Sequence, residues 1–523
     1  MVLYRFTRYL EKSIPLLTAL LLFGVLLFNL SLAVRASYSR DENLYISGAY
    51  LFSQGLVPYR DFYYTHLPYL LPLQALSFRF THYLILAGRM ISALCAAAVA
   101  GLVFWATQRA SPEQPPWVRF VLGVGWVMIL TANPLYEFAS SYAWNHQLTT
   151  LLALAAVLVF LWTARGKHSL VGLLTAGLLT GMSIGVRIYF VTILPAFALA
   201  LFFHPAGKGV RSFIRLAVVY AMGVVVALLP ILGYWLADPQ RFWFNNIANH
   251  SLDTLYRMQT GFDGPMTLPG VFGYFWGSVV SQPGNLALVL GLLCLVYPMG
   301  IWQVFKRRGI QNNDHGNTFE WLFWLSVVPL AEVGALTVAP PWYQRFYSAV
   351  PLVICALVFG LAQLLKQADL RRPLALLIFV EVVLLVNTYQ LDDYRRVTFL
   401  LHPETWRPLT YHEAGQKIKD QVGEGKVLTL SPVFPLEAGL PIYPEFSSGP
   451  LLWRISGLVD AEQREALGVI SSAELDAFLA NDPPAGILVG AEKSVEGPLN
   501  DYALRNGYQQ VPISDDLSLW VKP

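Results

Sequence analysis

Residues 40–62 read RDENLYISGAYLFSQGLVPYRDF and begin just after the first long apolar run of the chain. Between positions 44 and 55, apolar residues and glycines recur at helical spacing, which predicts an amphipathic helix lying along a membrane interface. A second interfacial helix is expected to start near Pro68. Two adjacent acids, Asp41 and Glu42, therefore stand where the first membrane helix leaves the bilayer. A large apolar domain that holds carboxylates at one membrane surface indicates that a reaction takes place at that surface.

The composition is typical of a polytopic membrane protein. Of 523 residues, 55% are hydrophobic and 13% are charged, and the mean hydropathy is +0.49. A soluble domain carries about 25% charged residues. The basic N-terminus leads into an apolar run of about 20 residues, longer than the core of a signal peptide. We therefore expect an uncleaved first span.

Windows of about 17 to 25 apolar residues predict about eleven membrane spans. They are 14–34, 83–106, 117–134, 148–164, 169–185, 188–203, 216–236, 284–304, 319–337, 347–365 and 373–389. One set of connectors is short and basic, and every lysine before residue 390 falls in it or in the N-terminus. By the positive-inside rule these basic connectors and the N-terminus lie on the cytoplasmic side of the membrane. An odd number of spans then places the C-terminus outside.

After about residue 390 the composition becomes polar and rich in turn residues. Strand-like runs, KVLTLSP at 426–432 and AGILVG at 485–490, alternate with helix-like stretches around 411–422 and 473–480. This alternation predicts a small α/β domain. We therefore divide the chain into an all-α transmembrane domain, 1–389, and an external soluble α/β domain, 390–523.

Before residue 390, arginine is the only basic residue besides histidine on the predicted external side. The positions are Arg35, Arg40, Arg60, Arg79, Arg187, Arg241, Arg257 and Arg345. The planar guanidinium group binds phosphate through two parallel hydrogen bonds and stays charged when partly buried. Arg187 and Arg345 each lie in a very short turn between two spans, so anchoring at lipid headgroups explains them poorly. Arg89, inside the second span, is instead expected to pack and to snorkel toward the interface.

The paired acids and the loop that follows them resemble the GT-C class of polytopic glycosyltransferases. The resemblance is to bacterial members related to protein O-mannosyltransferases and to the lipid A aminoarabinose transferase. Two further segments resemble parts of this family, each with one arginine at the outer end of a span: GMSIGVRIYFVTILP at 181–195 and PPWYQRFYSAVPLV at 340–353. The resemblance covers about residues 10–390 and, in outline, the external domain.

Such a resemblance implies a membrane enzyme that transfers a hexose or pentose from a polyprenyl-phosphate-linked donor. The acceptor would be a hydroxyl group of a lipid, a glycan or a protein on the external face, and the anomeric configuration would be inverted. It also implies a location in the bacterial plasma (inner) membrane, in contact with membrane lipids. A nucleic-acid partner is not expected.

Inverting transfer requires a carboxylate to accept the proton of the acceptor hydroxyl, and cations to stabilise the departing phosphate. We expect Asp41 to be the general base. Consecutive helical residues point about 100° apart, so we expect Glu42 to orient the acceptor or to coordinate a metal instead. Arg187 and Arg345 are the candidates for binding the donor phosphate.

Five further residues are candidate contacts to the acceptor or the substrate: Asp61, His66, Glu137, His146 and Tyr343. Asp61 and His66 could equally order their own loop. His146 could bind a metal or a phosphate, although an interfacial histidine more often does neither. Tyr343 could stack on a substrate or belong to the interfacial aromatic belt. A divalent metal ion is a candidate cofactor, and the metal requirement stays open.

Two other functions are consistent with a chain of many spans. A polysaccharide polymerase or ligase would lack the paired acids on the first loop. A transporter should gather its polar groups near the middle of the bilayer, in matched halves with broken helices. Here the charges gather on one face and no internal duplication is evident.

Overall fold

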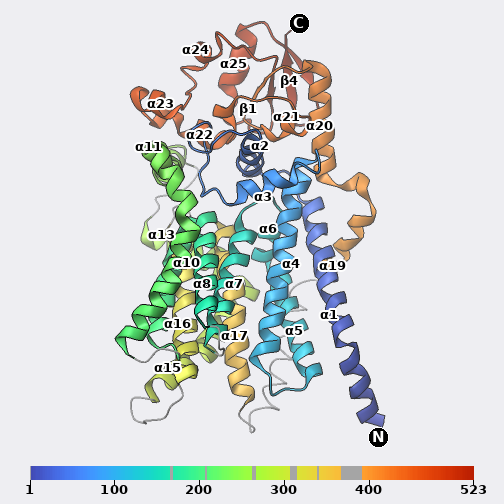
Figure 1. Cartoon of the computed structure of the whole chain (residues 1–523). Coiled ribbons are helices and arrows are strands. Elements are labelled where there is room, and N and C mark those ends of the chain that lie inside the picture. Colours follow the sequence, from blue (N-terminus) through green and yellow to red (C-terminus); the bar gives the residue numbers. More distant parts are fainter. Residues whose placement is uncertain are drawn as a thin grey trace.

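The protein is described by a computed structural model over residues 2–164, 169–205, 209–261, 267–306, 315–337, 341–366 and 392–522. A bundle of long helices forms one end of the molecule and a mixed α/β domain forms the other (Figure 1). The N-terminus lies at the end of the bundle farthest from the α/β domain (Figure 1).

Within the described residues, seven helices are long and apolar enough to cross a membrane. They lie in α1 (Val2–Arg35), α4 (Leu84–Ala110), α7 (His146–Thr163), α10 (Val210–Ala237), the run α14–η5–α15 (Pro283–Gly291, Leu292–Val296, Tyr297–Lys306), α16 (His315–Leu336) and the run η7–α17 (Tyr343–Ala349, Val350–Leu365). An eighth span results if α5 (Pro116–Thr131) and α6 (Pro134–Ser140), which are bent by 69°, are taken together.

Shorter helices complete this part of the chain. They are α8 (Ser169–Val186), η2 (Ile188–Ile193), α9 (Leu194–Phe202), α11 (Pro239–Trp243), η3 (Phe244–Ala248), α12 (Asn249–Gln259), α13 (Leu268–Tyr274) and η4 (Phe275–Val280). The first ten predicted spans each fall on a helix or on consecutive helices. The eleventh, 373–389, lies outside the described residues. The number of spans therefore stays a prediction.

Glycines allow α8 to pack closely on α10. A Cβ atom added at Gly177 would lie 2.1 Å from the carbonyl oxygen of Tyr220, and one at Gly181 would lie 2.7 Å from that of Val224. Small residues at such spacing let helix backbones approach each other in a membrane. Because α8 ends at Val186, this packing fixes the position of Arg187, the next residue.

The two predicted helices of the first loop are present. The first is η1 (Asn43–Ser47) followed by α2 (Gly48–Ser53), and the second is α3 (Leu70–Ser77). They lie between the bundle and the α/β domain (Figure 1). All five residues of η1 are buried, because α21 (Val433–Glu437) packs against it. The polar face of this segment is thus covered by protein.

The C-terminal domain contains a four-stranded sheet of order β1-β2-β4-β3. Strands β1 (Val427–Thr429) and β2 (Gly486–Val489) fall in the two predicted runs and pair in parallel. Strands β3 (Gln509–Pro512) and β4 (Ser518–Val521) form an antiparallel pair that joins β2 through β4. Besides α21, the helices are α20 (Arg407–Val422), α22 (Pro450–Ile455), α23 (Ala461–Leu467), α24 (Leu475–Leu479) and α25 (Gly497–Arg505).

Direct contacts attach this domain to the bundle. The short helix η9 (Arg396–Leu401) packs along α1. At the start of α4, the backbone N–H of Ile85 donates a hydrogen bond of 2.7 Å to the buried carboxylate of Glu437. Free N–H groups at the first turn of a helix attract a carboxylate. Glu437 therefore joins the α/β domain to the helix that follows the first loop.

Candidate active site

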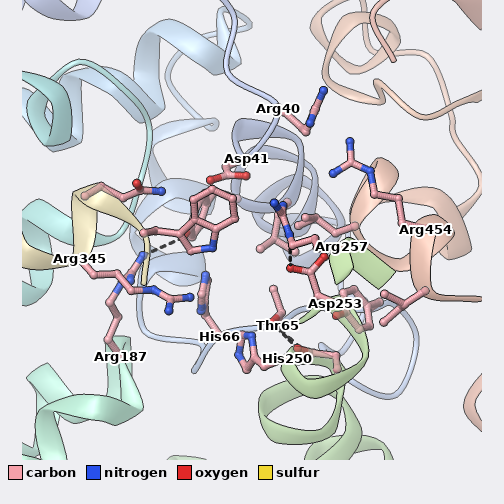
Figure 2. Close-up of a pocket in the computed structure, with 18 residues that line it drawn as sticks. Arg40, Asp41, Thr65, His66, Arg187, His250, Asp253, Arg257, Arg345 and Arg454 are labelled. Carbon is pink, nitrogen blue, oxygen red and sulfur yellow. Dashed lines mark hydrogen bonds and ion pairs between the residues drawn. The ribbon is translucent and has the colours of Figure 1, made fainter. Parts of the chain in front are cut away.

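A pocket of about 300 Å³ lies where the bundle meets the C-terminal domain (Figure 2). Its walls come from the connector after α1, from η1, the loop before α3, the turn after α8, helix α12, the start of η7, and α22 of the C-terminal domain. Five arginines and two carboxylates line it: Arg40, Arg187, Arg257, Arg345, Arg454, Asp41 and Asp253. This excess of positive charge favours an anionic ligand.

Asp41 lies in the turn between α1 and η1 and faces the pocket (Figure 2). Burial raises the pKa of Asp41, and four arginines of the pocket act in the opposite direction. The net change in pKa is upward, which makes the carboxylate a stronger proton acceptor. Asp41 thus combines access to the pocket with a pKa above its ordinary value.

Glu42 points into the protein core, where its carboxylate and the guanidinium group of Arg89 are both fully buried. Arg89 Nε donates to Glu42 Oε1 at 2.7 Å, and Arg89 Nη2 donates to Glu42 Oε2 at 2.8 Å. The backbone N–H groups of Ala143 and Ser39 donate to the same carboxylate at 3.0 and 3.2 Å. The remaining N–H groups of Arg89 donate to the carbonyl oxygens of Ala33, Ala36 and Ser37.

Two expectations from the sequence are corrected by this pair. Glu42 does not line the pocket, so the structure gives it no contact with an acceptor or a metal there. Arg89 does not snorkel, because every hydrogen-bond donor of its side chain is used inside the protein. The pair connects the first loop to α4 directly beside Asp41. The expected divergence of Asp41 and Glu42 is what the structure shows.

Arg187 reaches the pocket from the turn between α8 and η2. Its Nε donates a hydrogen bond to Asn145 Oδ1, and its Nη2 lies 2.8 Å from His146 Nε2. Since a guanidinium group can only donate, His146 Nε2 accepts and the ring proton is on Nδ1. His146 therefore lies behind Arg187 and orients it, and it is not one of the residues that line the pocket. Asn145 was not predicted as a site residue.

Arg345 lies in η7, at the start of the last described bundle helix, and is 7% exposed. It extends to the same side of the pocket as Arg187 (Figure 2). Residues that are far apart in the sequence, Asp41, Arg187 and Arg345, therefore line one pocket, as the sequence predicted.

Three more arginines line the opposite side of the pocket: Arg40, Arg257 and Arg454 (Figure 2). The guanidinium carbon of Arg257 lies 4.4 Å from the ring centre of Trp342, and its Nε is 3.0 Å from the Asp253 carboxylate. The sequence placed Arg40 and Arg257 on the external side without a role. It gave no signal for Arg454, which belongs to the C-terminal domain.

Two histidines line the pocket in a neutral state. The His66 ring stacks on Tyr45, with ring centres 5.4 Å apart. Burial and the nearby Arg187 hold the pKa of His66 well below its usual value. Burial and the charges of Arg345 and Arg187 lower the pKa of His250 to about 3. Neutral imidazoles can exchange hydrogen bonds with sugar hydroxyls.

Besides His146, three predicted contact residues lie outside the pocket. Asp61 orders its own loop, because its carboxylate accepts from Arg60 Nη2 and from the backbone N–H of Val57. Glu137 forms an ion pair with Arg396. The Tyr343 hydroxyl donates to Gln282 Oε1 at 2.8 Å. Glu137 and Tyr343 instead line another cavity of about 550 Å³, beside the end of α1.

Among the described residues, no group of three or more His, Cys, Asp or Glu side chains is arranged to hold a metal ion. The positive charge of the pocket is supplied by arginine side chains.

No protein-family model matches the sequence, and no curated protein matches it. The fold is similar to that of ArnT from Cupriavidus metallidurans. With its undecaprenyl phosphate complex the identity is 13%, the match covers 97% of each chain and the TM-score is 0.59. With its apo form the identity is 12%, the match covers 97% of this chain and 98% of the other, and the TM-score is 0.60. The expected architecture, a polytopic helical domain followed by a small α/β domain, is confirmed by this likeness of fold.

Proposed function

We propose that this protein is a membrane glycosyltransferase that transfers a sugar from a polyprenyl-phosphate-linked donor to a hydroxyl group of an acceptor. The observation that supports this most directly is the convergence of Asp41 with Arg187 and Arg345 in one cationic pocket. The ArnT-like fold supports it further. The ArnT structure contains undecaprenyl phosphate, which makes this lipid the first ligand to test.

In the proposed reaction, the acceptor oxygen forms a bond to the anomeric carbon while the bond from that carbon to the donor phosphate breaks. Asp41 accepts the proton of the acceptor hydroxyl. The departing polyprenyl phosphate gains one negative charge, which Arg187 and Arg345 stabilise. Attack from the face opposite the leaving phosphate inverts the anomeric configuration. His66 is a candidate contact to the sugar or the acceptor.

The function can be tested with the whole protein reconstituted in lipid nanodiscs. A panel of polyprenyl-phosphate sugars is added, and free polyprenyl phosphate and glycosylated product are followed by mass spectrometry. We expect one donor class to be cleaved with inversion, and lipid-linked sugar to accumulate in a strain that lacks the gene. Movement of intact donor across the membrane without cleavage would instead support the transporter. Cleavage of a diphosphate-linked polymer alone would support the ligase.

Replacement of Arg345 by alanine should lower turnover by about 100-fold or more, because one donor to the developing phosphate charge is lost. Arg60→Ala is the matched control, since Arg60 is an exposed arginine of the same face that does not line the pocket. It should leave turnover unchanged. Near-normal turnover of the Arg345→Ala protein would remove Arg345 from the mechanism.

We further propose that the pocket and the C-terminal domain face the outside of a bacterial plasma membrane and that the N-terminus is cytoplasmic. The distribution of lysine supports this orientation. In a Cys294→Ser background, an impermeant maleimide should label Leu504→Cys in intact cells, since Leu504 is exposed on α25. Val210→Cys, exposed at the start of α10, should react only after lysis. The reverse pattern would invert the proposed topology.

A further inference from the structure

The C-terminal domain forms part of the pocket wall. Helix α22 contributes Leu451, Arg454 and Ile455 to the lining. Arg454 extends from this domain toward the pocket, near Arg40 of the first connector (Figure 2). Two arginines from distant parts of the chain are thus brought together at the domain junction.

One buried carboxylate bonds to both arginines. Arg40 Nε donates to Glu492 Oε1 at 2.7 Å, and Arg454 Nη2 donates to Glu492 Oε2 at 3.3 Å. The side chain of Glu492 is 1% exposed, whereas that of Arg40 is 42% exposed. Without this bond, the long Arg40 side chain would be free to rotate into solvent. Glu492 therefore determines where Arg40 points.

The loop that carries Glu492 is itself fixed. The Glu496 carboxylate accepts the backbone N–H groups of Gly490 and Glu492, at 2.7 and 3.1 Å. Gly490 has a φ of +119°, and a Cβ atom there would lie 1.9 Å from the carbonyl oxygen of Asp516. Only glycine fits such a position. The loop thus presents Glu492 to the junction in one conformation.

We propose that the C-terminal domain is the outer wall of an anion-binding site, in which Arg454 and Arg40 bind phosphate oxygens and Glu492 is their positioning residue. This inference rests on the proposed function, because it assigns these arginines to the phosphate-bearing substrate. It makes the α/β domain a part of the substrate site itself.

Two effects of removing the Glu492 charge have opposite signs. Loss of a negative charge beside the pocket would, by field alone, strengthen binding of an anion. Loss of the bonds that orient Arg40 and Arg454 would weaken it. We expect the second effect to prevail, since a directed, charge-assisted hydrogen bond requires the donor to be in place.

The test compares Glu492→Gln with the unchanged full-length protein in nanodiscs, using undecaprenyl phosphate and inorganic pyrophosphate as probes. Kd for both probes, and KM for a lipid-linked donor, should rise about tenfold, while kcat changes little. Glu474→Gln is the matched control, because Glu474 is another arginine-bonded glutamate of this domain and lies outside the pocket. It should leave Kd and KM unchanged.

A double-mutant cycle separates positioning from a structural role. In an Arg40→Gln/Arg454→Gln background, Glu492→Gln should have no further effect on Kd. If Glu492→Gln does not fold, Arg454→Gln tests the same bond from the pocket side and should raise Kd similarly. Unchanged or tighter binding by these variants, or an undiminished effect in the double background, would overturn the inference. Binding of pyrophosphate but not of the lipid by the unchanged protein would instead count against the proposed donor class.

Discussion

Replacing Asp41 with asparagine is expected to lower turnover by about 10²- to 10⁴-fold, the contribution usual for a positioned general base. Asparagine has nearly the same shape but cannot accept the proton of an acceptor hydroxyl at neutral pH. Because the change removes a negative charge from among the pocket arginines, binding of undecaprenyl phosphate should be unchanged or tighter. The defect should therefore be in kcat and not in Kd.

Single-turnover measurements with reconstituted protein would separate these quantities. Asp253→Asn serves as the control, because Asp253 is the second carboxylate of the pocket and is paired with Arg257. Its loss should disturb Arg257 and raise KM, with a smaller change in kcat. If Asp41→Asn kept turnover within a few fold of the unchanged protein, Asp41 would not be the base.

Three residues of the pocket, Asp41, Arg187 and Arg345, could be predicted by physical reasoning on the sequence. The distribution of lysine assigned Asp41, Arg187 and Arg345 to one face of the membrane. Helix geometry predicted only that Asp41 and Glu42 would take different roles, and Glu42 was still expected to contact the acceptor or a metal. His66 also reaches the pocket, although its sequence context gave no preference between substrate contact and loop structure.

The rest of the pocket is formed by tertiary contacts, which cannot be predicted from the hydrophobic periodicity or the charge distribution of the sequence. Arg454 and Glu492 reach the site through the docking of the C-terminal domain, and nothing in the sequence specifies that register. His146 was a candidate substrate contact, but in the structure it supports Arg187 from behind. The pairing of Glu42 with Arg89 joins the connector after α1 to helix α4, and the spacing of the two residues in the sequence did not indicate it.

In the fold, too, some elements could be predicted from the sequence and others could not. Long apolar runs identified the bundle helices. The strands β1 and β2 were predicted from strand-like runs in the sequence, and the structure shows that both are fully buried. The hairpin β3–β4 was not predicted, since β3 reads QQVP and is mostly exposed. A short edge strand of this kind has no apolar alternation to reveal it.

Breaking the buried pair between Glu42 and Arg89 should have the largest effect on stability. Glu42→Gln would leave the Arg89 guanidinium charge buried without its counterion, and removing one partner of such a pair typically costs about 3–5 kcal/mol. The unfolding midpoint should fall sharply and the yield of folded protein should drop. Asp61→Asn is the matched control: it removes an acid paired with an arginine in the same loop, but that arginine is solvent-exposed, and little change is expected.

Replacing both partners, as Glu42→Leu with Arg89→Met, should restore part of the lost stability, because no unpaired charge remains in the core. Recovery should be incomplete, since the carbonyl oxygens of Ala33, Ala36 and Ser37 lose the donors that Arg89 supplies. Activity per folded molecule decides between the two roles considered for Glu42. A Glu42→Gln protein of normal stability but without turnover would return Glu42 to the catalytic site. A protein that is unstable yet active when folded would assign Glu42 to holding the connector on which Asp41 stands.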